Sequence, residues 1–277
     1  MSLSDDLGIV TQIARDAGRL ILEQYGKVSR LTKTNSATTD EAVTEADRAS
    51  QRLIVTALNQ HFPGDGIIGE ESDTGSTITN EVTDPIGRNW VIDPIDGTNN
   101  FIAGLGAFAV CIGLLDKGEP VLGVVYDVTR DLMYAAARGS GTTLNDRPVA
   151  ALSTPMGDSS LLMLTSNLID KTGRCPQWAC RFIGQTAWKT RILGSAALEA
   201  AQVAAGIANG AITVNGKLWD AAAPAAIVLE AGGMMTDLAG KPIFPFDLRN
   251  YTGAKVPFLA AGKASHAQLL KEIQDNP

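Results

Sequence analysis

A mixed α/β fold with two layered halves is predicted by three features of this 277-residue sequence. Helical stripes of apolar residues occupy much of the first sixty positions, and short apolar runs broken by turn residues follow from Trp90 to about residue 137. After about residue 150, strand-like and helix-like segments alternate, which is typical of α/β organisation. We therefore expect an α+β half over residues 1–150 and an α/β half over residues 151–277.

Two helices are expected at the start of the chain. Apolar side chains recur on one helical face from Leu7 to Ile21, which predicts a helix over residues 5–25 with Gly26 as its stop. Residues 31–39 are polar and predict an exposed, mobile loop. A second helix is expected over residues 45–61, because Thr44 and Asp47 have the spacing of a capping box.

The remaining elements follow from apolar runs and turn signals. A sheet built largely as a meander is expected from four runs, residues 90–92, 107–115, 121–126 and 132–137. In the second half the expected strands are residues 161–165, 211–214 and 258–261, and the expected helices are residues 196–205, 221–231 and a final one at the C-terminus.

Composition excludes several classes of protein. The chain is 45% apolar, which allows one large core or two modest ones, and no apolar run approaches the roughly 20 residues of a membrane helix. Its start lacks the pattern of a signal peptide, so we expect a cytoplasmic protein. The net charge of -7 argues against nucleic acid as a partner, and Cys111, Cys175 and Cys180 are expected to be reduced thiols.

The hexapeptide Asp93-Pro94-Ile95-Asp96-Gly97-Thr98 carries the strongest chemical signal. It follows the apolar run 90–92, so we expect the strand to end at Asp93 and Pro94 to turn the chain. Two carboxylates forced together repel each other unless a cation lies between them. Gly97 lets backbone N–H groups approach a ligand, and a helix starting near Thr98 adds an anion site. The stretch predicts Mg²⁺ beside a phosphate.

Acids elsewhere in the chain can complete such a site. Glu70 and Glu71 follow the apolar pair 67–68, just past a predicted strand. Asp220 precedes a strongly apolar helix, where a helix N-cap alone would explain it. Taken together, Glu70, Asp93, Asp96 and Asp220 would form an oxygen-rich cluster suited to a hard cation. Periodicity does not show whether they converge.

Three segments resemble the signature blocks of the inositol monophosphatase family. They are Gly69-Glu70-Glu71-Ser72, the hexapeptide 93–98 with Asn100-Phe101, and Trp219-Asp220, while residues 43–47 and 194–197 fall where the family has further blocks. The resemblance spans nearly the whole chain in the right order. It implies a layered αβαβα sugar-phosphatase fold, phosphomonoester hydrolysis dependent on two or three Mg²⁺ ions, lithium sensitivity in many members and a homodimer.

The resemblance also implies a role for each matching residue. One metal would take Glu70, Asp93 and the Ile95 carbonyl, and a second would take Asp93, Asp96 and Asp220. Glu70 and Thr98 would orient and deprotonate the attacking water, with Asp47 polarising Thr98 and Glu71 supporting the site or a third, weaker metal. An alternative for Asp47 is that it only caps its helix.

Substrate contacts are implied at a second group of positions. The N–H groups of Gly97 and Thr98 would hold phosphate, and Asp220 would lie beside the substrate. Gly194, Ser195 and Ala196 would meet its organic part, and the alternative for Ser195 is that it only caps its helix. Lys33 is either a lid cation over the phosphate or an ordinary surface lysine.

Substrate choice stays open at the sequence level. Inositol-selective members of the family have a glutamate where this chain has Thr213, and Asn215 or Lys217 are possible substitutes. Histidinol phosphate, fructose 1,6-bisphosphate and 3'-phosphoadenosine 5'-phosphate therefore remain alternatives. A regulatory or binding role in RNA metabolism is an alternative of another class.

Cys175 and Arg181 have the spacing of the cysteine phosphatase motif. That interpretation is set aside, because the residues between them lack the glycines that let backbone N–H groups surround a phosphate.

Overall fold

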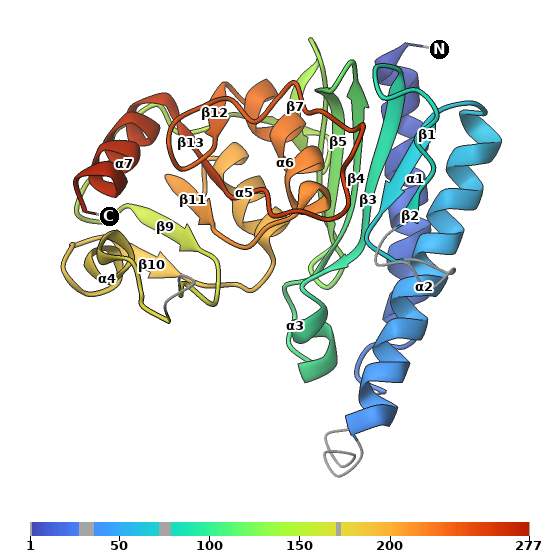
Figure 1. Cartoon of the computed structure of the whole chain (residues 1–277), viewed down its shortest axis with the longest axis horizontal. Coiled ribbons are helices and arrows are strands. Elements are labelled where there is room, and N and C mark those ends of the chain that lie inside the picture. The colour runs from blue at the N-terminus through green and yellow to red at the C-terminus, as the bar shows by residue number, and fades with distance from the viewer. Residues whose placement is uncertain (1, 28–35, 72–78, 170–172, 277) are drawn as a thin grey trace.

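The computed structural model describes residues 2–27, 36–71, 79–169 and 173–276. Their helices and sheets stack in five layers, α/β/α/β/α (Figure 1). Helices α1 and α2 form the first layer, α5 and α6 lie between the two sheets, and α4 and α7 cover the far side. The helices are α1 (Leu3–Leu22), α2 (Ser36–His61), α3 (Thr98–Ala103), α4 (Gln177–Gly184), α5 (Ala196–Ala204), α6 (Leu218–Glu230) and α7 (Lys263–Asp275). The layered fold implied by the resemblance is confirmed.

The first sheet has the order β2-β1-β3-β4-β5-β6-β7-β8. Its strands are β1 (Gly66–Gly69), β2 (Thr79–Asn80), β3 (Arg88–Asp96), β4 (Ala109–Asp116), β5 (Glu119–Asp127), β6 (Leu132–Ala137), β7 (Gly141–Leu144) and β8 (Arg147–Val149). From β3 onward each strand pairs antiparallel with the next, so the predicted meander is confirmed. The central strands are buried along almost their whole length because helices cover both faces.

Two paired glycines bring α6 close to this sheet. Gly113 on β4 lies opposite Gly123 on β5. A Cβ atom on Gly113 would lie 2.7 Å from the backbone nitrogen of Ala223, and one on Gly123 would lie 2.2 Å from its carbonyl oxygen. Only glycine leaves room for the backbone of a helix at this distance. The alanine-rich face of α6 therefore rests on the sheet, which fixes the position of its first turn.

The second sheet has the order β10-β9-β11-β13-β12. Its strands are β9 (Leu161–Leu164), β10 (Lys189–Arg191), β11 (Gly210–Thr213), β12 (Gly233–Thr236) and β13 (Phe258–Gly262). Strands β9 and β11 are parallel, whereas β13 runs antiparallel to both of its neighbours. The strands and helices predicted after residue 150 are confirmed to within a few residues, while α4, β10 and β12 were not predicted.

The structure corrects several predicted boundaries, and the first helix ends at Leu22, three residues before its predicted end. Helix α2 begins at Ser36, so residues 36–39 are helical and Thr44 and Asp47 lie inside the helix. The capping-box interpretation is therefore wrong, and the rest of the predicted polar loop, with Lys33, lies outside the described residues. Strand β3 continues through Pro94 to Asp96 and does not end at Asp93. No helix among the described residues is long and apolar enough to span a bilayer.

Candidate active site

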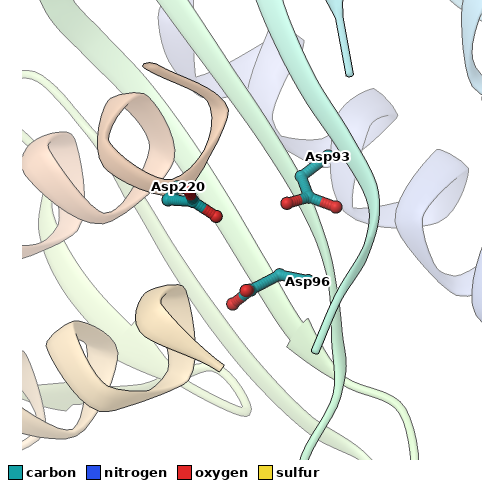
Figure 2. A group of neighbouring side chains, drawn as sticks. All are labelled: Asp93, Asp96 and Asp220. Carbon is teal, nitrogen blue, oxygen red and sulfur yellow. The ribbon is translucent and has the colours of Figure 1, made fainter. Parts of the chain in front are cut away.

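Three carboxylates from two distant segments meet at the end of β3. Asp93 and Asp96 come from β3, and Asp220 comes from the first turn of α6. One oxygen of each lies within 4.8 Å of the others, and Figure 2 shows the three side chains gathered in one space. Asp93 and Asp96 are buried and Asp220 is partly buried. The group can hold a metal ion, because carboxylate oxygens are the ligands that hard cations prefer.

A β-bulge explains how two acids three positions apart share one side of a strand. Side chains alternate along a regular strand, so residues 93 and 96 would point to opposite faces. Asp93 pairs with Cys111 and Asp96 pairs with Ala109, so the β3 segment between them has one residue more than β4. Pro94 suits this place because it has no N–H to offer a ladder. The Ile95 N–H donates to Asp93 Oδ1 at 3.0 Å, which fixes the Asp93 carboxylate.

Glu70 joins the cluster because β1 runs parallel to β3. Gly69 pairs with Ile92, so the next residue of each strand emerges at the same edge of the sheet. The Glu70 N–H donates to the Ile92 carbonyl at 3.2 Å. Burial raises the pKa of the Asp93 carboxyl group, and the Glu70 carboxylate lies close enough for its charge to raise that pKa further. Acids from residues 70, 93–96 and 220 therefore converge, which periodicity left undecided.

Helix α2 supports the strand end from the other side. The Gln51 side chain donates to the Glu71 carbonyl at 2.6 Å and accepts from the Glu71 N–H at 3.0 Å. Asp47 lies one turn earlier on the same helix and is buried. Burial, followed by the charges of Glu71 and Glu70, raises the pKa of Asp47 to about 8. Asp47 and Glu71 are thus neighbours of the cluster.

Burial and mutual repulsion make these carboxyl groups hard to ionise. Burial raises the pKa of Glu70 to about 7, with smaller contributions from neighbouring charges. Burial and the neighbouring acids hold the pKa values of Asp93 and Asp220 well above their usual range. For Asp96, burial raises the pKa while donors at the start of α5 lower it. A cation bound between these carboxyl groups would favour their ionised forms and lower their pKa values.

The start of α5 is built onto Asp96. Ser195 is the N-cap residue, and its hydroxyl accepts from the Leu198 N–H at 3.3 Å. The same hydroxyl donates to Asp96 Oδ2, which also accepts from the Ala197 N–H at 2.8 Å. The cap that the sequence offered for Ser195 is confirmed. Contact of Gly194, Ser195 and Ala196 with a substrate stays a prediction.

Gly97 shapes the turn from β3 into α3. Its φ of +95° is a left-handed conformation, and a Cβ there would lie 3.0 Å from the Ala107 carbonyl oxygen. Helix α3 then begins at Thr98, as predicted. The Thr98 hydroxyl donates to the Ile95 carbonyl at 3.0 Å, so these two predicted site residues are bonded to each other.

Asp220 does not have the position that the sequence suggested. Lys217 is the N-cap residue of α6, and Asp220 is the third residue of the helix. The Lys217 N–H donates to Asp220 Oδ2 at 2.6 Å, so the carboxylate still satisfies a free N–H of the first turn. The N-cap prediction was wrong because the helix begins three residues earlier than its apolar pattern.

Thr213 ends β11 and is only 1% exposed. Among the described residues, no donor or acceptor reaches its hydroxyl oxygen.

The three cysteines are free thiols, as expected, with Cys111 buried and Cys175 and Cys180 exposed.

Sequence reasoning missed three supporting residues. Gln51 holds the strand end at Glu71, Asn100 holds the turn before α5, and Glu199 lies beneath that turn. Asn100 stands inside one of the quoted motifs, but no local pattern indicated its role. Gln51 and Glu199 lie within helices, where such residues are ordinary.

Comparison with known proteins agrees with the resemblance. A model of the inositol monophosphatase family matches residues 3–277. The fructose-1,6-bisphosphatase/inositol-1-monophosphatase of Thermotoga maritima is 35% identical over 86% of this chain and 86% of its own. The Nus factor SuhB of Pasteurella multocida is 35% identical over 84% of this chain and 85% of its own.

Solved structures support the same conclusion. The inositol monophosphatase of Anabaena (Nostoc) sp. PCC 7120 superimposes with a TM-score of 0.80 at 29% identity, covering 100% of this chain and 98% of that one. The match of the family model over nearly the whole chain shows membership directly. This chain belongs to the inositol monophosphatase family and is a phosphomonoesterase by that membership.

Proposed function

We propose that this protein hydrolyses a small phosphomonoester with Mg²⁺ as its cofactor. The observation that carries the proposal is the convergence of the buried Asp93 and Asp96 with the partly buried Asp220 in one group, with Glu70 close to Asp93. Burying several acids without a partner is unfavourable, because each loses hydration and each repels the others. A purely structural role would be better served by apolar residues of similar size.

The donor set fits Mg²⁺. All side-chain ligands are carboxylates, and Mg²⁺ is commonly bound by a few carboxylates together with substrate phosphate. We assign Glu70, Asp93 and the Ile95 carbonyl to one ion, and Asp93, Asp96 and Asp220 to another. The Ile95 carbonyl accepts one hydrogen bond from Thr98 and keeps a lone pair. Glu71 would support a third, weaker ion.

The remaining chemistry belongs to residues of the chain. When bound, Mg²⁺ supplies positive charge that offsets the negative charge of the phosphoryl oxygens and makes a water molecule more acidic. We assign the acceptance of the water's proton to Glu70. The Thr98 hydroxyl, which donates its own proton to the Ile95 carbonyl, would orient the water as an acceptor, and Asp47 would support the site from α2. Backbone N–H groups of Gly97 and Thr98 would hold the phosphate.

The preferred ester is a separate part of the proposal. Thr213 stands where inositol-selective members have a glutamate, and its buried hydroxyl offers no charged anchor for a ring hydroxyl. We therefore propose a sugar phosphate or related metabolite other than inositol 1-phosphate as the preferred substrate. The bifunctional name of the Thermotoga maritima relative supports testing fructose 1,6-bisphosphate. Histidinol phosphate and 3'-phosphoadenosine 5'-phosphate are the other esters to compare.

Assembly completes the proposal. The family resemblance supports a homodimer. Light scattering during size-exclusion chromatography would test the dimer, and a monomer at all concentrations would contradict it.

Purified protein assayed against a panel of phosphomonoesters, with Mg²⁺ and then with chelator, tests the function. We expect turnover of at least one ester with Mg²⁺ and none with chelator. The control variant is Glu230→Gln. Glu230 is a partly buried residue at the end of α6, and its carboxylate accepts hydrogen bonds from the turn between β6 and β7 and from none of the site residues.

A second candidate function is regulatory. The name of the Pasteurella multocida relative, a Nus factor, favours testing it. The net charge of -7 counts against direct RNA binding, so a protein partner is the better hypothesis. Absence of turnover on every ester of the panel, with a folded and Mg²⁺-binding protein, would favour the regulator over the enzyme.

A further inference from the structure

We propose that Glu199 is a positioning residue, which holds the turn before α5 so that the Asp96 carboxylate is fixed for cation binding. The inference rests on the proposed function, because it assigns Asp96 to the cation site. Glu199 itself does not touch Asp96 and belongs to no motif that the resemblance used. Its action passes through the backbone of residues 193–197.

The contacts of Glu199 reach backward from α5 to the turn. Its Oε1 accepts from the Leu193 N–H at 2.8 Å and from the Gly194 N–H at 3.2 Å. The side chain is 1% exposed, and burial raises the pKa of its carboxyl group to about 8. Among the described residues, no donor reaches its second oxygen, Oε2. One oxygen therefore satisfies two backbone donors that precede the helix.

The opposite side of the same turn is held by Asn100. Its Nδ2 donates to the Leu193 carbonyl at 2.7 Å and to the Ala107 carbonyl at 2.8 Å. Gly194 has a φ of +80°, and a Cβ there would lie 3.1 Å from the Asn100 amide nitrogen. The turn is thus fixed through its N–H groups by Glu199 and through a carbonyl by Asn100.

The fixed turn delivers two donors to one oxygen of Asp96. The Ser195 hydroxyl and the Ala197 N–H both donate to Asp96 Oδ2. A carboxylate with one oxygen held in this way cannot rotate freely, which orients Oδ1 as well. Asp96 is one of the three acids whose oxygens lie within 4.8 Å of each other. Placement of the turn therefore decides how Asp96 faces the other two acids (Figure 2).

A capping role alone does not account for Glu199. Ser195 already caps α5 through the Leu198 N–H. A buried carboxyl with a free oxygen costs desolvation energy that a helix cap does not require. The cost is understandable if the geometry of the turn must be exact to within a few tenths of an ångström, as cation ligands demand.

The test compares two substitutions with a matched control. Glu199→Met keeps the length of the side chain and removes both acceptors, whereas Glu199→Gln keeps an oxygen in the place of Oε1. The control is Glu230→Met. Glu230 is matched to Glu199 because one of its two carboxylate oxygens, Oε2, also accepts hydrogen bonds from two backbone N–H groups of a turn, those of Gly139 at 2.9 Å and Gly141 at 3.2 Å.

Binding of Mn²⁺ alone, measured by calorimetry on each folded protein, is the readout. We expect Glu199→Met to weaken binding about 10- to 100-fold, as loss of a residue that supports a metal ligand usually does. Glu199→Gln should recover most of that affinity, and Glu230→Met should bind as the unchanged protein does. Amide hydrogen exchange should show faster exchange at residues 193 and 194 in Glu199→Met.

Unweakened Mn²⁺ binding in folded Glu199→Met would overturn the inference, and so would an equal loss in Glu230→Met. If Glu199→Met does not fold, Glu199→Asp replaces it, because the shorter side chain keeps the charge and loses the reach. Unweakened binding in that variant would overturn the inference in the same way. Failure of the proposed function is seen separately, because the unchanged protein would then bind no Mn²⁺ or turn over no ester.

Discussion

Replacing Asp93 by asparagine should make the metal-free protein more stable while abolishing its activity. The substitution keeps the shape of the side chain and an oxygen able to accept from the Ile95 N–H. It removes a carboxyl group that lies among three other acids. Repulsion between two unit charges 4.8 Å apart is about 3.5 kcal/mol at an effective dielectric constant of about 20.

Protonation limits what this repulsion can cost. Keeping a carboxyl group with an ordinary pKa of 3.8 protonated at about pH 7.5 costs the folded state at most about 5 kcal/mol, because each pH unit contributes about 1.36 kcal/mol. Asparagine needs no proton, but its amide must find acceptors and the other acids remain, so we expect a net gain of about 1–3 kcal/mol. For 277 residues this corresponds to a rise in Tm of about 2–5 °C.

Calorimetric unfolding in chelator and in Mg²⁺ is the assay. The unchanged protein should gain stability in Mg²⁺, by about 4.1 kcal/mol at a concentration about 1,000 times the Kd, whereas Asp93→Asn should gain little. The order of stability would then reverse between the two solutions. An Asp93→Asn protein that is less stable in chelator, or that retains turnover, would refute the assignment of Asp93.

The remaining predictions concern pH, substrate choice and the Gly97 turn. In chelator the free energy of unfolding should fall as pH rises from about 4 to about 8, since folded Asp47 and Glu199, with pKa values raised to about 8, hold protons that the unfolded chain releases. Urea titrations across that range would measure the slope, and rising stability would contradict it. Thr213→Glu should raise kcat/KM for inositol 1-phosphate relative to the other esters, and an unchanged ranking would show that this position does not set substrate choice. Gly97→Ala should cost about 1–3 kcal/mol, because its φ is +95° and a Cβ would meet the Ala107 carbonyl oxygen, and thermal unfolding without a lowered Tm would contradict this.

The elements that the sequence predicted are those whose signals are local. The apolar runs of the meander and the stripe of the first helix depend on period and on turn residues, and both were confirmed. The errors occurred where polar sequence continues a helix, as at Ser36, or where an acid is compatible with several positions, as at Asp220. At the start of α6 a tertiary contact adds to the local one, because the Tyr251 hydroxyl accepts from the Leu218 N–H.

Part of the candidate site could be predicted from the sequence, for the same reason. The acids themselves could be named, because closely spaced carboxylates beside glycine have few structural uses. Their convergence could not be derived, because it depends on the parallel pairing of β1 with β3, on the bulge between Asp93 and Asp96, and on the two glycines under α6. None of these three features has a signature in the pattern of hydrophobicity.

The sequence by itself determined which side chains of this protein can do chemistry, since charge and hydrogen-bonding capacity belong to each residue. Only the tertiary structure decided where those side chains face and what holds them there. Glu199 illustrates the difference, because a glutamate on a helix is ordinary until the turn of residues 193–194 is folded over it. Distance and orientation arise from packing between segments far apart in the chain, and that packing gives the cluster of acids its electrostatics.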